Sequence, residues 1–442
     1  MRRWLGRPLA VLAGAVVLLL GAGVAVGGPP RDPPGPARPP ASVDAAGAAS
    51  GADLGAVAAS LQERLRRVPG DWQAWASLGS VYVQQAITTA DPGFYAKAAG
   101  AFERSVSEGP EGNDAAVVGQ AALAASRHNF AEARDLARRA IELNAFNSSA
   151  YGVLTDALVE LGDYEASYAS VQKMLELRPG VPSYARVSYA FELQGDLEGA
   201  KVALDEVLRL ATNPSDAGFA HRYLGELAFG QGNLDEAGRQ FAAGLERAPT
   251  YTPLLAGRAR VAAARGQVDA ALQDWADVVQ RLPEPGYLTE LGDLYTSLGR
   301  TQDAADQYAV VRVTQQLFTA AGSDLDLEQS LFAADHGDPA GALRSAERAW
   351  QSRRSIDTAD AYAWALHMNG RSLEARELAT LAQQLGTRRA AFAYHRGVIE
   401  MAVGDIPAAR QSLGSALEIN PYFSPLHAPR AEAALAQLGP AT

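Results

Sequence analysis

A pattern of small residues returns along this chain every 33 to 38 residues, from about Asp71 onward. Eight glycines in short polar turns mark the period: Gly162, Gly195, Gly232, Gly266, Gly299, Gly337, Gly370 and Gly404. His128 takes this place in an earlier unit, and Gly93 takes it in the first unit, which has a short insertion around residues 87–91. A fixed period of this length is the signature of repeat architectures, in which each repeat is one supersecondary unit. The chain is therefore predicted to be an array of units.

Two further positions carry small side chains in every unit. Five residues after the turn residue lie Ala98, Ala133, Ser167, Ala200, Ala237, Ala271, Ala304, Ala342, Ala375 and Ala409. Seven residues before it, allowing for the insertion in the first unit, lie Gly79, Ala121, Thr155, Ser188, Gly225, Ala259, Gly292, Ser330, Ala363 and Gly397. Antiparallel helices need small side chains where their axes come closest, because larger ones would push the helices apart. Each unit is therefore predicted to be a helix–turn–helix.

The ends of the two helices in a unit are also predicted by residue type. Glycine in the turn suits the left-handed backbone that ends a first helix. Proline cannot continue a helix, so the second helices of several units are expected to stop before the prolines at 110, 179, 249, 283 and 421. Residues 311–322 are expected either to extend a second helix or to form a linker. Residues 323–389 depart from the pattern, because they lack the closing proline.

The chain resembles the tetratricopeptide repeat family over roughly residues 71–423. The resemblance is clearest in LGDYEASYASVQKMLELRP and in YLGELAFGQGNLDEAGRQFAAGLERAP. Members of this family stack units of about 34 residues into a right-handed superhelix. The resemblance implies an all-α, right-handed α-solenoid of about ten stacked helix–turn–helix repeats. A capping helix is expected after Pro425, where an amphipathic segment follows the last unit.

The N-terminal residues have the features of an export signal. Arg2, Arg3 and Arg7 precede an uncharged apolar run that begins at Leu9 and is long enough to span a bilayer as a helix. Residues 1–28 are thus predicted to be either a signal peptide or an N-terminal membrane anchor, and both alternatives stay open. The remaining domains are predicted as a Pro/Ala/Gly-rich linker (29–55), the solenoid (56–425) and a capping helix with a tail (426–442). We expect an exported bacterial protein, secreted or anchored to the outer face of the cytoplasmic membrane.

Charge and motifs exclude several functions. The net charge of -11 argues against nucleic acid as a partner, and the absence of cysteine excludes thiolate nucleophiles and thiolate metal sites. The sequence contains no phosphate-binding loop, no zinc-protease helix and no nucleophile elbow. The protein is therefore expected not to be an enzyme and to need no cofactor. Membrane contact is expected only through an uncleaved N-terminal segment.

The resemblance implies that a partner binds in the concave groove lined by the first helices. The family's groove positions fall on Tyr189, Arg222, Glu226, Phe229, Arg260, Asp293, Thr296, Trp364, His367 and Tyr394. Exposed aromatic and arginine side chains are common anchors in protein interfaces. We therefore expect a non-catalytic extracytoplasmic scaffold that binds a protein or peptide partner in this groove. Its oligomeric state is left open.

An acidic cluster near the C terminus supports an alternative. Four residues recur at i, i+3, i+7 and i+10 of one predicted helix and so share a face: Asp357, Asp360, Trp364 and His367. Three further carboxylates precede them: Asp324, Asp326 and Asp335. Carboxylates with one imidazole can hold a divalent metal weakly. The alternative is an envelope accessory protein that handles a divalent metal or a cationic small ligand here, although a solvated acidic face explains the same residues.

Overall fold

The computed structural model describes residues 51–439, and all its regular elements within this range are α-helices. The predicted export segment, residues 1–28, and most of the predicted linker lie outside the described residues. The first described helix, α1 (Gly51–Arg67), begins within the last residues assigned to the linker. In residues 51–439 no helix is both long enough and apolar enough to cross a membrane.

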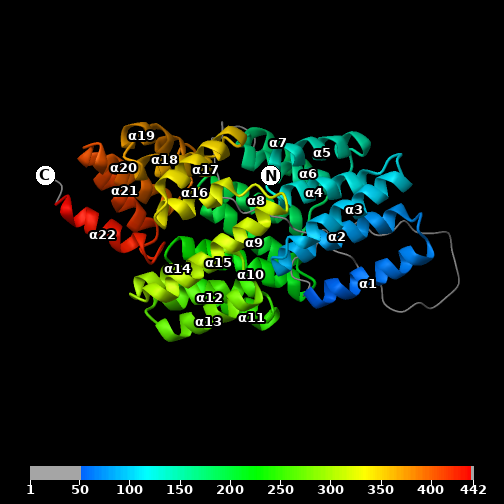
Figure 1. Cartoon of the computed structure of the whole chain (residues 1–442), viewed down its shortest axis with the longest axis horizontal. Helices are drawn as coiled ribbons and strands as arrows, with labels where there is room; N and C mark the ends of the chain where they lie inside the picture. The colour runs from blue at the N-terminus through cyan, green and yellow to red at the C-terminus, as the bar shows by residue number, and fades with distance from the viewer. Residues whose placement is uncertain (1–50, 440–442) are drawn as a thin grey trace.

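Ten helix–turn–helix units follow α1, and we number them 1 to 10 (Figure 1). Their first helices are α2 (Trp72–Thr89), α4 (Asp114–Ser126), α6 (Ser148–Leu161), α8 (Val181–Leu193), α10 (Pro214–Gly230), α12 (Thr252–Ala264), α14 (Pro285–Ser297), α16 (Asp326–Asp335), α18 (Ile356–Met368) and α20 (Ala390–Ala402). Their second helices are α3 (Gly93–Glu108), α5 (Phe130–Leu143), α7 (Tyr164–Leu177), α9 (Leu197–Leu210), α11 (Leu234–Arg247), α13 (Val268–Arg281), α15 (Thr301–Ala320), α17 (Pro339–Ser352), α19 (Ser372–Leu381) and α21 (Ile406–Ile419). A last helix, α22 (His427–Gln437), follows unit 10. The prediction of an all-α solenoid of about ten repeats with a capping helix is confirmed.

The small residues lie at the contacts between the two helices of a unit, as predicted. All ten side chains at the position five residues after the turn are buried. In unit 5, a Cβ atom added to Gly225 would lie 2.5 Å from the ring of Phe241 on the second helix. That distance is far inside van der Waals contact, so only glycine lets the aromatic ring pack against the backbone of α10.

The predicted turn glycines all adopt the left-handed backbone, with φ between 69° and 90°. His128 adopts the same conformation, with φ of 61°. Unit 1 corrects the prediction: its left-handed residue is Ala90, and Gly93 is the first residue of α3. The inserted residues lengthen the first helix, so that α2 continues to Thr89 and the left-handed turn residue, Ala90, follows directly.

Proline ends the second helices as expected. The helices α3, α7, α11, α13 and α21 each end two residues before one of the five predicted prolines. Residues 311–320 extend α15 to 20 residues rather than forming a linker. In the region that lacks closing prolines, α16 and α19 are only 10 residues long.

Single helices close the two ends of the array. Helix α1 packs on α2 in the manner of a second helix, and α22 packs on α20 and α21 in the manner of a first helix. Gly439, with φ of 69°, takes the turn position after α22. The position seven residues before the turn has a small side chain in all ten units, but after α21 it is occupied by Glu432, which is exposed. A solvated carboxylate at this position suits a face that meets water rather than another helix.

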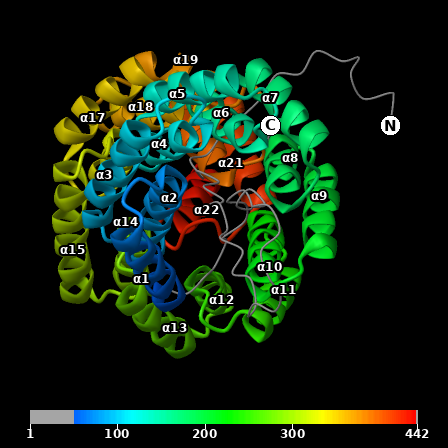
Figure 2. The same ribbon diagram turned by 90° about the vertical axis from the view of Figure 1, so that its right-hand side faces the viewer.

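The solenoid coils tightly enough for its second half to pack against its first half. Figure 2 shows the first helices on the inner side of the coil and the second helices on the outer side. The turns inside units 2 to 5 contact the loops that follow units 7 to 10, and we call this set of contacts the seam. Its hydrogen bonds run from Asp324 N to Arg127 O (2.8 Å), from Ile356 N to Tyr164 Oη (3.0 Å), from Thr387 Oγ1 to Leu193 O (2.5 Å) and from Asn420 Nδ2 to Phe229 O (2.8 Å).

The seam also has an apolar core. One buried cluster joins residues of units 3 and 4 to residues of units 9 and 10 and their connections: Val159, Tyr164, Leu193, Ile356, Ala359, Ala382, Leu385 and Phe392. Burying a large aliphatic or aromatic side chain stabilises by about 1.5–3 kcal/mol. The seam is therefore part of the folded core and joins residues that lie about 190 positions apart in the sequence.

Two turn glycines approach the opposite backbone at the seam. A Cβ atom added to Gly162 would lie 2.4 Å from the carbonyl oxygen of Arg354. A Cβ atom added to Gly195 would lie equally close, at 2.4 Å, to the carbonyl oxygen of Gly386. Backbone cannot yield as a side chain can, so any residue other than glycine would force the two halves of the coil apart.

The turn glycines therefore provide a matched test of the seam. Gly266 and Gly299 have φ of 72° and 73°, but nothing lies within 4 Å of an added Cβ atom. We expect Gly162→Ala and Gly195→Ala to lower the free energy of unfolding by about 1–3 kcal/mol more than Gly266→Ala and Gly299→Ala. In all four variants, alanine in the left-handed backbone conformation costs a similar free energy of about 1–2 kcal/mol. Urea unfolding followed by circular dichroism measures the difference, and equal losses in the four variants would contradict the seam.

Candidate functional site

Charged groups join the first helices of neighbouring units along the inner side of the coil. Arg186 of α8 donates to Asp156 of α6 through Nε at 2.8 Å and through Nη2 at 2.6 Å. The two side chains are only 5% and 6% exposed. Burial raises the pKa of Asp156 to about 6, although Arg186 acts in the opposite direction. This pair links units 3 and 4 and is not available to a partner.

The same arrangement recurs in units 5 to 7 but stays partly open to water. Arg260 of α12 donates to Glu226 of α10 at 2.8 Å and to Glu290 of α14 at 2.6 Å. The side chains of Arg260, Glu226 and Glu290 are 20%, 30% and 38% exposed. Arg222 lies one turn before Glu226, with Nε 3.9 Å from its carboxylate, which is too far for a hydrogen bond. We call Arg222, Glu226, Arg260 and Glu290 the open charged patch.

Aromatic side chains surround this patch. The guanidinium group of Arg222 lies 4.9 Å from the ring centre of Tyr223, and that of Arg260 lies 6.0 Å from the ring centre of Trp275. Arginine over an aromatic ring gains a favourable electrostatic interaction. The predicted residues Arg222, Glu226 and Arg260 are brought together by two consecutive first helices, α10 and α12, and α14 adds Glu290.

Two predicted groove residues are buried, which corrects the sequence analysis. Trp364 and Tyr394 are each only 4% exposed and belong to an apolar cluster with α20, α21 and α22. The indole nitrogen of Trp364 donates to Asp335 at 2.8 Å. The ring of Tyr394 stacks on His427 at 4.9 Å between centres. The tight coil and the cap cover these positions, so they hold the C-terminal units together instead of facing a partner.

The other predicted residues are engaged within the fold. Asp293 accepts hydrogen bonds from Tyr308 and His336, and the hydroxyl of Thr296, an exposed residue, bonds to the hydroxyl of Tyr308. The ring of His367 contacts Ser372 and stacks on Trp364. Phe229 packs against the core of units 5 and 6, while its carbonyl oxygen belongs to the seam. None of these side chains lies in the open charged patch.

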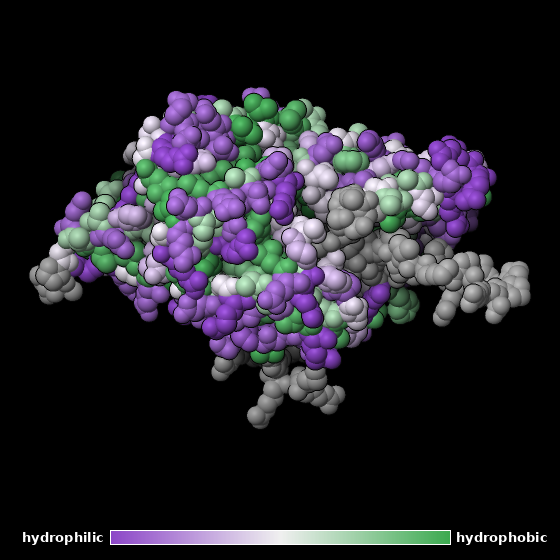
Figure 3. All heavy atoms as spheres, turned by 90° about the horizontal axis from the view of Figure 1, so that it is seen from below, coloured by the Kyte–Doolittle hydropathy of each residue, from purple (hydrophilic) through white to green (hydrophobic). Residues whose placement is uncertain are grey.

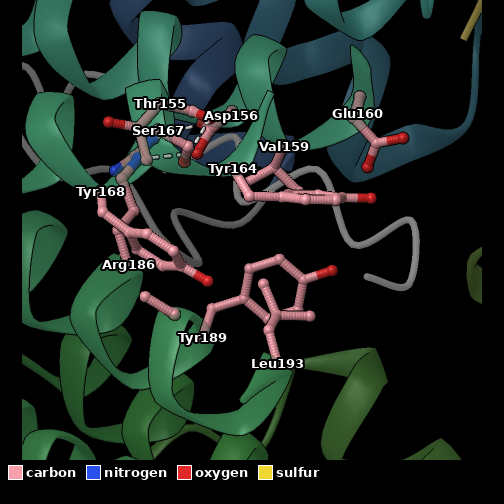
Figure 4. Close-up of a pocket in the computed structure, with 11 residues that line it drawn as sticks. Thr155, Asp156, Val159, Glu160, Tyr164, Ser167, Tyr168, Arg186, Tyr189 and Leu193 are labelled. Atoms are coloured by element: carbon pink, nitrogen blue, oxygen red, sulfur yellow. Dashed lines mark hydrogen bonds and ion pairs between the residues drawn. The ribbon is translucent and has the colours of Figure 1, made fainter. Parts of the chain in front are cut away.

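Tyr189 lies at a small cavity in units 3 and 4. Figure 4 shows Tyr164, Tyr168 and Tyr189 around it, with the hydrogen bond from Ser167 to the backbone of Thr155 beside them. The cavity measures about 10 Å³, which is room for about one water molecule. It is therefore no binding site for an organic ligand.

The acidic C-terminal residues are dispersed into separate pairs. Asp357 binds Arg389 at 2.7 Å, Asp360 binds His395 at 2.8 Å and Asp326 binds Arg348 at 2.5 Å. The carboxylate of Asp324 accepts a hydrogen bond from the backbone N–H of Asp326. Between residues 51 and 439 no group of three or more histidine, aspartate or glutamate side chains is placed to hold a metal ion. The face is also not a solvated one, because the side chains of Asp357 and Asp360 are only 11% and 4% exposed.

Sequence reasoning missed Glu290 and the buried pairs. A signal exists, because the paired residues stand about one repeat apart: Asp156 and Arg186 by 30 positions, and Arg260 and Glu290 also by 30. In both pairs the first residue stands six positions before its turn glycine and the second stands nine positions before the next turn glycine. An acid and an arginine at these two positions indicate a bridge between consecutive first helices.

The outer surface of the coil carries apolar side chains among polar ones (Figure 3). The longest exposed apolar row lies on the extended helix α15, where Val310, Val313 and Leu317 are 43%, 56% and 58% exposed. Their spacing places them on one face of the helix.

The tetratricopeptide repeat model matches residues 118–182, 188–252 and 257–316, which are units 2 to 7 apart from short gaps. No curated protein matches the chain. A tetratricopeptide repeat protein from Parabacteroides merdae is similar in structure, with 20% identity over 58% of this chain and 98% of that one, and a TM-score of 0.35. The thermophilic repeat protein TTC0263 from Thermus thermophilus is also similar, with 25% identity over 44% of this chain and 98% of that one, and a TM-score of 0.37. A chain of the APC/C hetero-tetramer Cut9-Hcn1 shows 13% identity over 88% of this chain and 94% of that one, with a TM-score of 0.39. Units 2 to 7 are thus tetratricopeptide repeats, and the ten hairpins in register repeat the same helix–turn–helix unit along residues 72–419.

Proposed function

We propose that this protein is a non-catalytic scaffold that binds a protein or peptide partner on the inner face of units 5 to 7. Tetratricopeptide repeats generally mediate protein interactions, and proteins built from them are typically not enzymes. The observation that supports this location is the open charged patch. Its four side chains remain 20% to 38% exposed, whereas the corresponding pairs of units 3 and 4 and of units 9 and 10 are buried.

The chemistry of the patch favours a peptide over a small apolar molecule. Arginine and glutamate alternate along α10, α12 and α14, and the half-buried ring of Tyr223 lies beside Arg222. An extended segment or a helix of a partner can match such alternation with its own charged and apolar side chains. Arg222 is the best anchor, because Glu226 is already engaged by Arg260 and arginine binds carboxylates and aromatic rings alike.

We also propose that the solenoid acts outside the cytoplasm, secreted or held at the outer face of the membrane. The support is in the sequence alone: three arginines, an apolar run from Leu9 and a proline-rich stretch before the first repeat. A spacer of that composition keeps a folded domain away from its anchor or cleavage site.

Arg222 and Arg239 test the binding face. Arg239 is a 69% exposed arginine on the outer helix α11 and serves as the matched control. The full chain, tagged at its C terminus, is cross-linked in cells, its partner is identified by mass spectrometry, and the affinity is then measured by calorimetry. We expect Arg222→Ala to weaken binding about tenfold or more, equivalent to about 1–3 kcal/mol, because a central interface arginine is a common hot spot.

Arg239→Ala should leave the affinity unchanged, and both variants should keep the helix content and melting temperature of the natural protein. If Arg222→Ala binds with the same affinity as the natural chain, the partner does not bind at the open charged patch.

The location is tested by protease protection. We expect protease added to intact spheroplasts to digest the protein, because an exported solenoid is exposed there while cytoplasmic proteins are not. A cytoplasmic enzyme in the same sample is the control for lysis, and survival of the full-length protein would contradict export. N-terminal sequencing of the purified protein should start near Gly28 for a signal peptide and at Met1 for an anchor.

A further inference from the structure

Histidines are concentrated at the C-terminal end of the coil, and three of them face an aspartate on another helix. The pairs are His336 of α16 with Asp293 of α14 at 2.9 Å, His395 of α20 with Asp360 of α18 at 2.8 Å, and His427 of α22 with Asp335 of α16 at 3.4 Å. Each pair joins two different units, or a unit and the cap. The side chains of all three histidines are less than 10% exposed.

The pair of His395 and Asp360 lies at the centre of this group. Its imidazole stacks on the indole of Trp364, with 4.3 Å between ring centres and 14° between planes. Nδ1 of His395 contacts one carboxylate oxygen of Asp360, while the other oxygen, Oδ1, and Nε2 of His395 are both buried without a hydrogen-bond partner. Asp360 therefore depends on the charge of His395, because a buried carboxylate without a counter-charge is strongly destabilising.

Other titratable groups face these histidines from every neighbouring helix. Asp335 of α16, His367 of α18, Tyr394 of α20 and His427 of α22 surround His395. Around His336 lie Asp293 of α14, Tyr308 of α15 and Asp335 of its own helix. Arg430 of α22 interacts with Tyr394. Carboxylates thus outweigh cations around both His336 and His395.

The balance of these groups sets the sign of the pH dependence. Burial acts to lower the pKa of His395, but Asp360 and Asp335 outweigh it and raise that pKa above its ordinary value. The same holds for His336, where burial is outweighed by Asp293. A raised pKa means that each pair stabilises the fold fully below pH 6.5 and loses its contribution as pH rises through the raised pKa.

The pKa of His367 is shifted in the opposite direction to the pKa values of His336 and His395. Burial and the neighbouring His395 lower the pKa of His367, so it prefers to be neutral in the folded protein. Its hydrogen bond with the hydroxyl of Ser372 needs no charge. The net effect of acidification from pH 8.5 to pH 6 is therefore stabilising.

We propose that the two pairs His395–Asp360 and His336–Asp293 form a pH-sensitive clamp that joins unit 10 to unit 9 and unit 8 to unit 7. The clamp is tight in mildly acidic solution and loosens above neutral pH. Units at the end of a solenoid contact neighbours on one side only, so they open locally at less cost than the centre. This device is independent of the partner bound at units 5 to 7.

Hydrogen exchange of the full chain tests the clamp. After correction for the intrinsic pH dependence with an unstructured peptide, we expect residues 390–437 to exchange severalfold faster at pH 8.5 than at pH 6, because the histidines of the clamp lose their charge over this range. The double variant His336→Gln and His395→Gln should lose this difference, because glutamine keeps a hydrogen-bond donor but does not titrate. The control is His221→Gln, since His221 contacts Gln240 and no carboxylate.

Equal corrected exchange at the two pH values in the natural protein would overturn the proposal, as would a full pH difference in the double variant. Tryptophan fluorescence provides a second readout that needs no stable variant of the histidines. A charged imidazole stacked on Trp364 quenches its emission, so the difference between the natural protein and Trp364→Phe should titrate with a midpoint above 6.5. A flat difference signal between pH 5.5 and 8.5 would show that His395 does not change charge there.

Discussion

The close approach of two helices inside each hairpin determines the rest of this structure. Ala or Ser five residues after each turn, and a small residue seven before it, bring the second helix onto the backbone of the first, as Phe241 does over Gly225. Because the same spacing recurs ten times, every unit is added to the last with a similar rotation. A large side chain at one such position would alter the direction of all units that follow it.

The tight curvature has a chemical consequence for the inner face. In an open solenoid the inner positions of the first helices meet solvent and ligands. Here they bond to each other across units, as Arg186 does to Asp156, or are covered by later units, as Val159 of α6 is by Ile356. Such pairs, once dehydrated, hold neighbouring units in one relative orientation and contribute little as recognition groups. The charged side chains of units 5 to 7 keep access to water, since they remain 20% to 38% exposed.

The sequence predicts what is local and misses what depends on curvature. Turn glycines, closing prolines and small packing residues could be placed within one or two positions, because each acts on its own hairpin. Ala90 was missed because the insertion in unit 1 hides the register. Trp364 and Tyr394 do lie on first helices, but whether such a position is open depends on α22 and on units one turn of the coil away. No single hairpin contains that information.

The seam makes the order of synthesis matter for this chain. In an ordinary repeat array each unit finds its neighbours as soon as they are made. Here Val159 and Leu193 find their apolar partners only when Ile356, Leu385 and Phe392 have appeared, about 190 residues later. The first half of the molecule therefore passes through a stage with an uncovered apolar edge. A chain that leaves the ribosome or crosses a membrane from its N terminus must keep that edge from pairing elsewhere until its last third arrives.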